Sequence, residues 1–292
     1  MIEDSIMNNE NMLLIGGREQ TQKKALEVIM EKINEEGNLI ITDTASRYLY
    51  DNTVEIAKKR KYKIVRLDPY ARHHQSIDIM QSKDDDDKEV ICSSLPEYLL
   101  GEMFIGEPEE YISPSKYTWS SELISYMLAN QQVLKQLKKF LRASSVKKVA
   151  DQLYHQEPQL VAMLGGEPPW RIADDLTDIR NTLFRRLSAK KEVEMLSHKE
   201  YDLTNFGKEK TIIYIAPIPE SRLEPFIIER ILELNSTSMI PCTVIMDEGS
   251  CIREPYQYEW NINTNYLLML HTDTVPSCEY IKSSCRQTYY CA

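Results

Sequence analysis

The sequence predicts an α/β protein in which a parallel sheet is interrupted by a mostly helical insertion. Short apolar segments of strand length alternate with segments of helical periodicity in residues 1–90, and the alternation returns in residues 200–292. Residues 91–199 show helical patterns without strands. Strands joined by single helices form right-handed crossovers and lie parallel in one sheet, so we expect the two outer segments to form one domain around the helical insertion.

The expected elements of the first segment alternate regularly. Its first helix has apolar residues at near-helical spacing and stops at Gly37, because glycine favours a helix C-terminus. Each strand is short and apolar, as buried parallel strands are. The expected strands are Met12–Ile15, Asn38–Thr42 and Lys63–Leu67, and the expected helices are Thr21–Ile33 and Arg47–Lys61.

The stretch from Asp68 to Lys88 is expected to be a loop. It contains four consecutive aspartates, Asp84–Asp87, which repel one another and favour a solvated conformation. A metal site is the alternative interpretation, but adjacent carboxylates in a loop make a poor preformed cage for a cation. We therefore expect a solvent-facing segment.

The insertion is expected to contain one long amphipathic helix, marked by apolar residues from Leu123 to Leu137. Shorter helices are expected at residues 146–154, 158–164 and 172–187. Basic residues gather along these helices. They indicate either a nucleic-acid-binding face or a solvated helix surface, and we favour the solvated surface. These basic residues are Lys135, Lys138, Lys139, Arg142, Lys147 and Lys148.

The sheet is expected to resume with strands at Thr211–Ala216, Cys242–Met246 and Tyr266–Leu270. Each is an apolar run of the length of a buried strand. A helix is expected at Arg222–Leu234 and another near Cys278–Cys285. Tyr266–Leu270 is expected to be the last strand of the sheet.

Composition limits the class of protein. The 292 residues are 42% hydrophobic, enough for a sizeable core, and no apolar run approaches the ~18 residues of a membrane helix. The chain begins with acidic residues and shows no apolar signal core, so we expect a cytoplasmic protein. The net charge of −10 argues against strong sequence-independent binding to nucleic acid, although a local basic face stays open. None of the six cysteines forms a C-x-x-C motif, which favours reduced thiols over a zinc site.

A degenerate phosphate-binding loop follows the first strand. The Walker A pattern is G-x-x-x-x-G-K-[ST] between a strand and a helix, and Gly16 fits its first position, followed by Gly17. The second glycine is replaced by Thr21, the lysine by Gln22, and the hydroxyl residue by Lys23. The loop therefore lacks the backbone freedom, the phosphate cation and the magnesium-binding hydroxyl that nucleotide hydrolysis uses.

A second half-motif ends the strand at Cys242–Met246. Asp247 and Glu248 follow it, which is the Walker B arrangement. In an intact site the aspartate holds magnesium, and the glutamate orients or deprotonates the attacking water. Together with the altered Walker A loop, these residues predict a P-loop NTPase (RecA-like) sheet in which Gly16, Gly17 and Lys23 face the old magnesium site.

Several ordered segments resemble the cytosolic domain of type IV secretion coupling proteins, the TraG-type ATPases of conjugative DNA transfer. These segments are Leu13–Gly17, Leu39–Asp43 with Tyr50–Thr53, Tyr62–Asp68, Asp202–Leu203 with Lys208–Ile215, Val244–Glu248 and Asn263–Leu270. The chain departs from the family where Asp43 is followed by Thr44–Arg47 instead of Pro-Lys-Gly-Glu. Gly249–Cys251 likewise replaces Phe-Ala-Asn, and the segment after it is too short for the family's sensor strand.

The resemblance implies a degenerate coupling-protein-like module, or pseudo-ATPase, of a mobile genetic element. We expect it to bind protein partners of a conjugation or secretion apparatus and no cofactor, with recruitment by partners to the inner face of the cell membrane. DNA is a weaker expected partner because the chain is acidic. Family members form hexamers through nucleotide-bearing interfaces, and we favour a monomer here.

Two alternatives stay open. One is a nucleotide-binding protein or weakly active ATPase, in which Lys23 reaches a phosphate and Asp247 and Glu248 serve magnesium. The other is purely structural: Gly16 and Gly17 form a strand-to-helix turn, and the acidic pair is a solvated strand end, because short motifs often match by chance.

Overall fold

The computed structural model describes residues 11–43, 47–100, 114–130, 133–143, 145–156, 169–216, 218, 223–247, 264–271 and 287–291. Seven parallel strands form one sheet in the order β3-β4-β2-β5-β6-β1-β7. They are β1 (Met12–Gly16), β2 (Asn38–Thr42), β3 (Lys63–Leu67), β4 (Thr211–Ile215), β5 (Cys242–Met246), β6 (Thr264–His271) and β7 (Gln287–Cys291). The six expected strands and their parallel arrangement are confirmed. The prediction that Tyr266–Leu270 is the last strand is wrong, because β7 follows it and pairs with β1.

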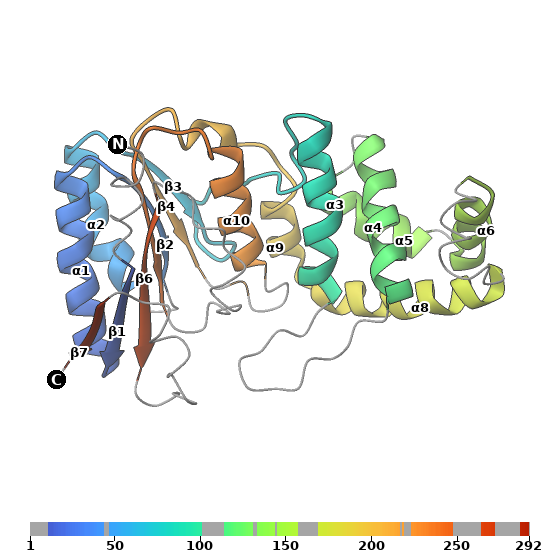
Figure 1. The fold of residues 1–292 in the computed structure, drawn as a ribbon, viewed down its shortest axis with the longest axis horizontal. Coiled ribbons are helices and arrows are strands. Elements are labelled where there is room, and N and C mark those ends of the chain that lie inside the picture. Colours follow the sequence, from blue (N-terminus) through green and yellow to red (C-terminus); the bar gives the residue numbers. More distant parts are fainter. Residues whose placement is uncertain are drawn as a thin grey trace, which may run out of the picture.

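Helices cover both faces of the sheet (Figure 1). Helices α1 (Arg18–Asn34) and α2 (Tyr48–Lys59) pack on one face, and α10 (Glu224–Leu234) packs on the other. Successive residues of a strand point to opposite faces, so Leu13 joins the core under α10 and Leu14 joins the core under α1. This double covering explains why the strands are apolar throughout.

A helical part extends from the α10 face, away from α1 and α2 (Figure 1). One hydrophobic cluster continues from this face of the sheet through α10 into the helical part. The predicted division at residues 91 and 199 stays a prediction. The helices of this part are α3 (Asp85–Leu100), α4 (Pro114–Ala129), α5 (Leu134–Ala143), α6 (Val146–Gln156), α8 (Pro169–Arg186) and α9 (Lys190–Met195).

The predicted single long helix is two helices. The chain leaves α4 at Ala129 and begins α5 at Leu134, and each contributes apolar residues to the core, including Leu123 and Leu137. A turn lets α4 pack on α3 and α8 while α5 packs on α8 and α9, which one straight helix does not allow. The helices expected at 146–154 and 172–187 are confirmed as α6 and α8. Those expected at 158–164 and 278–285 lie outside the described residues.

Asp85–Asp87 form the first turn of α3, so the predicted loop ends at Asp84, while Asp84, Asp85 and Asp86 are exposed as the solvated segment was expected to be. The carboxylate of Asp84 accepts the N–H of Asp87 (2.9 Å), as a helix cap does. Negative charge is also favourable in the first turn, at the positive end of the helix dipole. Among the described residues, no group of three or more His, Cys, Asp or Glu side chains is placed to hold a metal ion.

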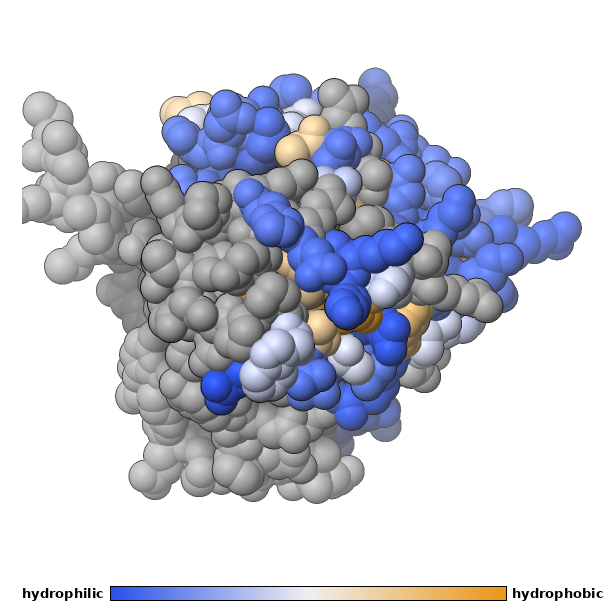
Figure 2. All heavy atoms as spheres, turned by 90° about the vertical axis from the view of Figure 1, so that its right-hand side faces the viewer, coloured by the Kyte–Doolittle hydropathy of each residue, from blue (hydrophilic) through white to orange (hydrophobic). Residues whose placement is uncertain are grey.

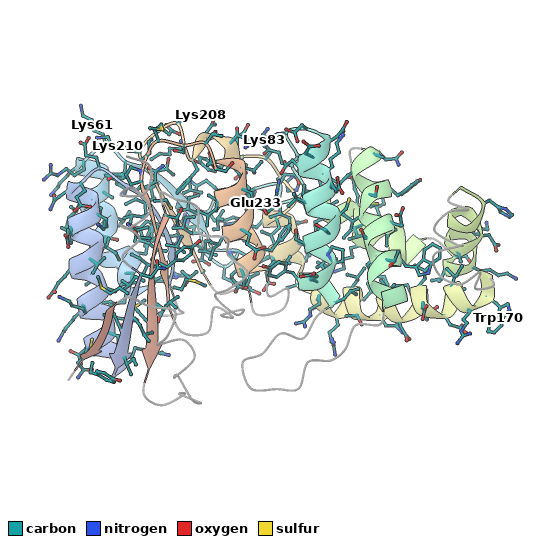
Figure 3. All side chains as sticks on the ribbon, in the orientation of Figure 1. Lys61, Lys83, Trp170, Lys208, Lys210 and Glu233 are labelled. Atoms are coloured by element: carbon teal, nitrogen blue, oxygen red, sulfur yellow. The ribbon has the colours of Figure 1, made fainter. Side chains whose placement is uncertain are left out.

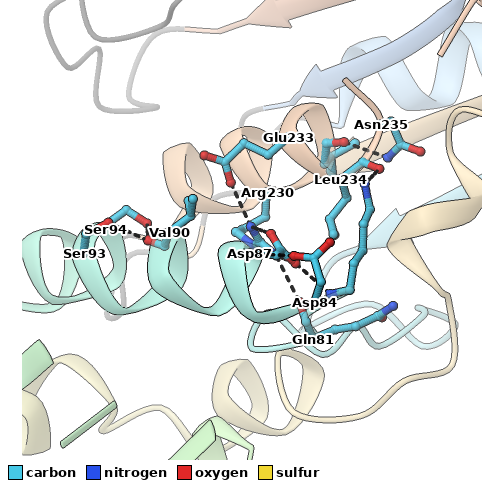
Figure 4. Close-up of polar contacts among 12 residues, drawn as sticks. Gln81, Asp84, Asp87, Val90, Ser93, Ser94, Arg230, Glu233, Leu234 and Asn235 are labelled. Atoms are coloured by element: carbon cyan, nitrogen blue, oxygen red, sulfur yellow. Dashed lines mark hydrogen bonds and ion pairs between the residues drawn. The ribbon is translucent and has the colours of Figure 1, made fainter. Parts of the chain in front are cut away.

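A buried ion pair joins α3 to α10 (Figure 4). The fully buried guanidinium of Arg230 contacts both carboxylate oxygens of Asp87, at 2.7 and 2.9 Å. It also donates to the carbonyl of Gln81 (3.0 Å) and to Glu233 (2.8 Å). The ammonium of Lys83 donates to the carbonyl of Leu234, at the end of α10. These contacts fix the helical part to the sheet domain.

The surface of the helical end is mostly hydrophilic where it is described, and its apolar areas are small and separated (Figure 2). Trp170, at the start of α8, is 66% exposed and lies at the far end of the helical part (Figure 3). No helix in the described ranges is long and apolar enough to cross a membrane.

Candidate functional site at the carboxyl edge of the sheet

Ligands of open parallel sheets bind beyond the carboxyl ends of the strands. In this sheet, Gly17 follows β1, Asp43 follows β2, Asp68 follows β3 and Asp247 follows β5. Asp43 and Asp247 follow strands that pair directly with each other. Glu248, the predicted catalytic residue, lies outside the described residues.

The connection from β1 to α1 is a single residue, Gly17. Helix α1 begins at Arg18, and the N–H of Thr21 donates to the carbonyl of Gly17 (3.0 Å), which closes the first turn. The Thr21 hydroxyl also donates to the carbonyls of Gly17 (3.1 Å) and Arg18 (3.0 Å). A Walker A loop arches around phosphate over the residues between its two glycine positions. Here only Gly17 is extended and the other three of these residues, Arg18, Glu19 and Gln20, are helical, so no arch is present.

Gly16 is needed for contact between strands. A Cβ atom at this position would lie 2.4 Å from the carbonyl oxygen of Cys291 in β7. A Cβ atom at Gly17 would lie 2.5 Å from the side-chain oxygen of Gln20. Close packing against the backbone of β7 therefore explains Gly16, whereas the flexible side chain of Gln20 could move away from a Cβ atom at Gly17. The role of both glycines in nucleotide binding stays a prediction.

Lys23 lies on the solvent-facing side of α1. Its side chain is 63% exposed, and its ammonium pairs with Glu19 one turn earlier, at 2.6 Å. The hydrogen bond to Glu19 raises the pKa of Lys23 above its ordinary value, and the same contact lowers the pKa of Glu19. Gln22, at the position of the Walker A lysine, is buried, and its Nε2 atom has no hydrogen-bond partner among the residues that the structure describes.

Asp43 and Asp247 form a buried acidic pair at the ends of β2 and β5. The Asp43 carboxylate accepts the N–H groups of Tyr50 (2.8 Å) and Leu49 (3.4 Å), which begin α2. Burial raises the pKa of Asp43 to about 6, and the charge of Asp247 adds to this rise. The backbone N–H of Asp247 donates to the hydroxyl of Thr42 (2.8 Å). The sequence hypothesis singled out Asp247 but gave Asp43 no site role, although both directly follow buried strands.

By contrast, Asp68, at the end of β3, is paired with two arginine side chains. Its carboxylate contacts the guanidinium groups of Arg66 (2.8 Å) and Arg47 (3.2 Å). The Arg66 guanidinium also lies over the ring of Tyr50, 4.3 Å from the ring centroid, in cation–π contact. This cluster stabilises the end of β3 against α2.

Two chemical features therefore meet at the carboxyl edge. The oxygens of Asp43, Asp247 and Thr42 are of the kind that magnesium prefers. The N-terminus of α1 favours an anion. However, the one-residue turn at Gly17 and the pairing of Lys23 with Glu19 do not fit the phosphates of a nucleoside triphosphate, which need an arched loop and a free cation.

The fold defines a P-loop NTPase-like α/β protein with an all-parallel, seven-stranded sheet. The chain is similar to the plasmid coupling protein TrwB in complex with the non-hydrolysable ATP analogue ADPNP, with a TM-score of 0.65, 13% identity and cover of 99% of this chain and 71% of that chain. It is similar to TrwB with ADP and Mg2+ (TM-score 0.63, 12% identity, 99% and 70% covered). It is also similar to the bacterial conjugative coupling protein TrwB with sulphate (TM-score 0.61, 12% identity, 100% and 72% covered).

At these identities the likeness concerns the fold, including the helical part. No protein-family model matches the sequence, and no curated protein matches it either.

Proposed function

We propose that this protein is a coupling-protein-like module of conjugative DNA transfer or type IV secretion that does not hydrolyse ATP and acts by binding protein partners. The carrying observation is the fold likeness to TrwB over 99% of the chain, combined with the one-residue turn at Gly17. The fold is retained while the phosphate-binding arch is lost. The partners belong to the transfer apparatus, and DNA is a weaker candidate because the net charge is −10.

The proposed loss of hydrolysis follows from the electrostatics of phosphoryl transfer. Preorganised positive charge at the phosphates is usually the largest catalytic term, and removing the cation and the backbone cradle costs several kcal/mol. Gln22 is neutral, and Lys23 is held by Glu19 on the helix surface. In this proposal the protein therefore needs no cofactor. It acts in the cytoplasm, where partners recruit it to the inner face of the membrane.

One observation favours the alternative function, a nucleotide-binding protein or weakly active ATPase. The carboxyl groups of Asp43 and Asp247 are both buried at the ends of neighbouring strands, and the charge of Asp247 helps to raise the pKa of Asp43. A divalent cation between these carboxylates would offset the free-energy cost of burying two negative charges close together. In this alternative, Asp247 serves magnesium, Glu248 acts on water, and ATP binds at the start of α1.

The deciding experiment is isothermal titration of the full chain with ATP and magnesium, paired with an ATP turnover assay. Our proposal expects neither binding heat nor turnover from folded protein, and Lys23→Ala leaves both unchanged. Magnesium-dependent hydrolysis that Glu248→Gln abolishes would refute the proposal and support the alternative. Saturable binding without turnover would support a nucleotide-sensing protein and would also contradict the cofactor-free form of the proposal.

A further inference from the structure

The amino edge of the sheet, opposite to the candidate site, carries a concentration of positive charge. Lys61, Lys208 and Lys210 lie along this edge (Figure 3). The basic edge consists of six cations from the end of α2 and the starts of β3 and β4: Lys59, Arg60, Lys61, Lys63, Lys208 and Lys210. The acids in the adjoining turns are three, Glu35, Glu36 and Glu209, so the local net charge is +3 in a chain of net charge −10.

Structural roles account for only part of the basic edge. Lys59 lies at the C-terminus of α2, where positive charge favours the helix dipole, and Arg60 donates to the side chain of Asn34 (3.0 Å). Lys210 pairs with Glu36 at 2.6 Å. Lys61 and Lys63 are exposed, and neither forms an ion pair with a described residue. Lys208 contacts only the hydroxyl of Thr204, at 3.5 Å. Three lysines of the edge are therefore left without an acidic partner among the described residues.

The basic edge is continuous because it follows the starts of neighbouring strands. The N–H of Lys63 in β3 donates to the carbonyl of Lys210 before β4 (2.8 Å). Asn38 in β2 accepts the N–H of Thr211 in β4 through its side chain and donates its own N–H to the carbonyl of Pro241 before β5, each at 2.8 Å. Four strands spaced ~4.8 Å apart give a surface about 15 Å wide.

An exposed apolar side chain adjoins these cations. Met239, in the turn before β5, is 86% exposed. The hydroxyl of the preceding residue, Ser238, donates to the carbonyl of Gly207 (3.0 Å), and the N–H of Gly207 donates to Asn235 (2.8 Å). These bonds hold the Met239 turn against the turn that carries Lys208. The surface thus combines a row of lysines with a solvent-exposed methionine.

We propose that the basic edge and Met239 bind the anionic surface of a lipid bilayer. Lysine and arginine side chains near such a surface gain electrostatic free energy, and apolar side chains at the same level insert between the headgroups. A nucleic acid duplex would also attract the lysines, but an apolar side chain enters a duplex only by unstacking base pairs, whereas it enters a bilayer surface without that cost, so the exposed methionine favours the bilayer. This proposal concerns the edge opposite to the candidate site and stands independently of the proposed function.

The test is co-sedimentation of the full chain with vesicles of phosphatidylglycerol and phosphatidylcholine, against vesicles of phosphatidylcholine alone. We expect binding to the anionic vesicles that weakens as salt is added. The variant Lys61→Gln with Lys63→Gln should lower the partition coefficient roughly 30-fold, because each lysine contributes about 1 kcal/mol at an anionic surface. Met239→Ser should lower the binding that persists at high salt.

The matched control is Lys147→Gln with Lys148→Gln, which removes two exposed cations from α6 in the helical part. It should leave vesicle binding unchanged, and circular dichroism checks that each variant is folded. Equal loss of binding in the control and test variants would refute a localised surface. Failure to sediment with anionic vesicles at low salt, with or without binding to a DNA duplex in a mobility-shift assay, would overturn the proposal.

Discussion

The buried carboxyl groups of Asp43 and Asp247 follow neighbouring strands, and the charge of Asp247 adds to the burial that raises the pKa of Asp43 to about 6. Asp43 is also held by the first turn of α2, through the N–H of Tyr50. Because its pKa is raised in the folded state, protonation of the Asp43 carboxyl group changes the free energy of unfolding.

Stability is expected to depend on pH through Asp43. The folded protein keeps this proton up to about pH 6, whereas an unfolded aspartate releases it near 3.8, so the free energy of unfolding falls between these two values as pH rises. Asp43→Asn retains an oxygen for the Tyr50 N–H and removes this dependence. Urea unfolding should be measured near pH 3.8 and near pH 6. Between these two values, the free energy of unfolding of the variant should rise relative to that of the wild type by up to about 3 kcal/mol. A constant difference across the interval would contradict the assignment.

The neighbouring aspartate offers an independent check. Asp247→Asn removes a repulsive charge, so the pKa of Asp43 should fall while staying above its ordinary value, because burial is the larger cause. NMR titration of the Asp43 carboxyl carbon measures this shift directly. Asp51→Asn is a useful control, since the Asp51 charge also raises the pKa of Asp43 but ranks below that of Asp247.

Removing Arg230 is expected to destabilise the protein strongly. Arg230→Met leaves the largely buried carboxylate of Asp87 without its counter-ion, which is expected to lower the free energy of unfolding by about 4 kcal/mol. Lys88→Ala is the matched control, because it removes the exposed partner of Asp85 and should change stability by less than about 0.5 kcal/mol. Urea denaturation compares the two variants. Similar small effects would show that the link between α3 and α10 carries little free energy.

Adding a methyl group at Gly16 is expected to disturb β7. The Cβ atom of Gly16→Ala would lie 2.4 Å from the carbonyl oxygen of Cys291, so β7 must shift. This shift should lower the free energy of unfolding by about 1–3 kcal/mol. Gly37→Ala serves as the comparison, since its Cβ atom would lie 3.3 Å from the nearest atom, the carbonyl oxygen of Pro241. Hydrogen exchange of the β1 and β7 amides should increase only in the Gly16 variant.

Buried strands were predictable from the sequence because their apolar runs report local burial. β2, β3 and β5 begin and end at the predicted residues. β7 was missed because its sequence, Gln-Thr-Tyr-Tyr-Cys, is partly polar, and this strand lies at the edge of the sheet with β1 as its partner. Its place depends on a strand far away in the sequence, which periodicity does not reveal.

The site was only partly predictable for the same reason. Asp247 was found through its position after a buried strand. The closed turn at Gly17 depends on where α1 begins, and the sequence placed that start at Thr21 instead of Arg18. Likewise, the ion pair of Asp87 needs Arg230, which lies 143 residues later. The ion pair depends on a contact between distant segments, and the local run of charges around Asp87 does not identify Arg230 as its partner.

The pairing of β1 has a consequence for how the protein is made. β1 leaves the ribosome before the other described strands, yet both of its neighbours, β6 and β7, lie within residues 264–291. At usual rates of synthesis, β1 waits on the order of ten seconds or more for these partners. The nascent chain thus carries an unpaired apolar strand while the residues between β1 and β6 are made. Such late pairing slows folding and makes the growing chain a client for chaperones.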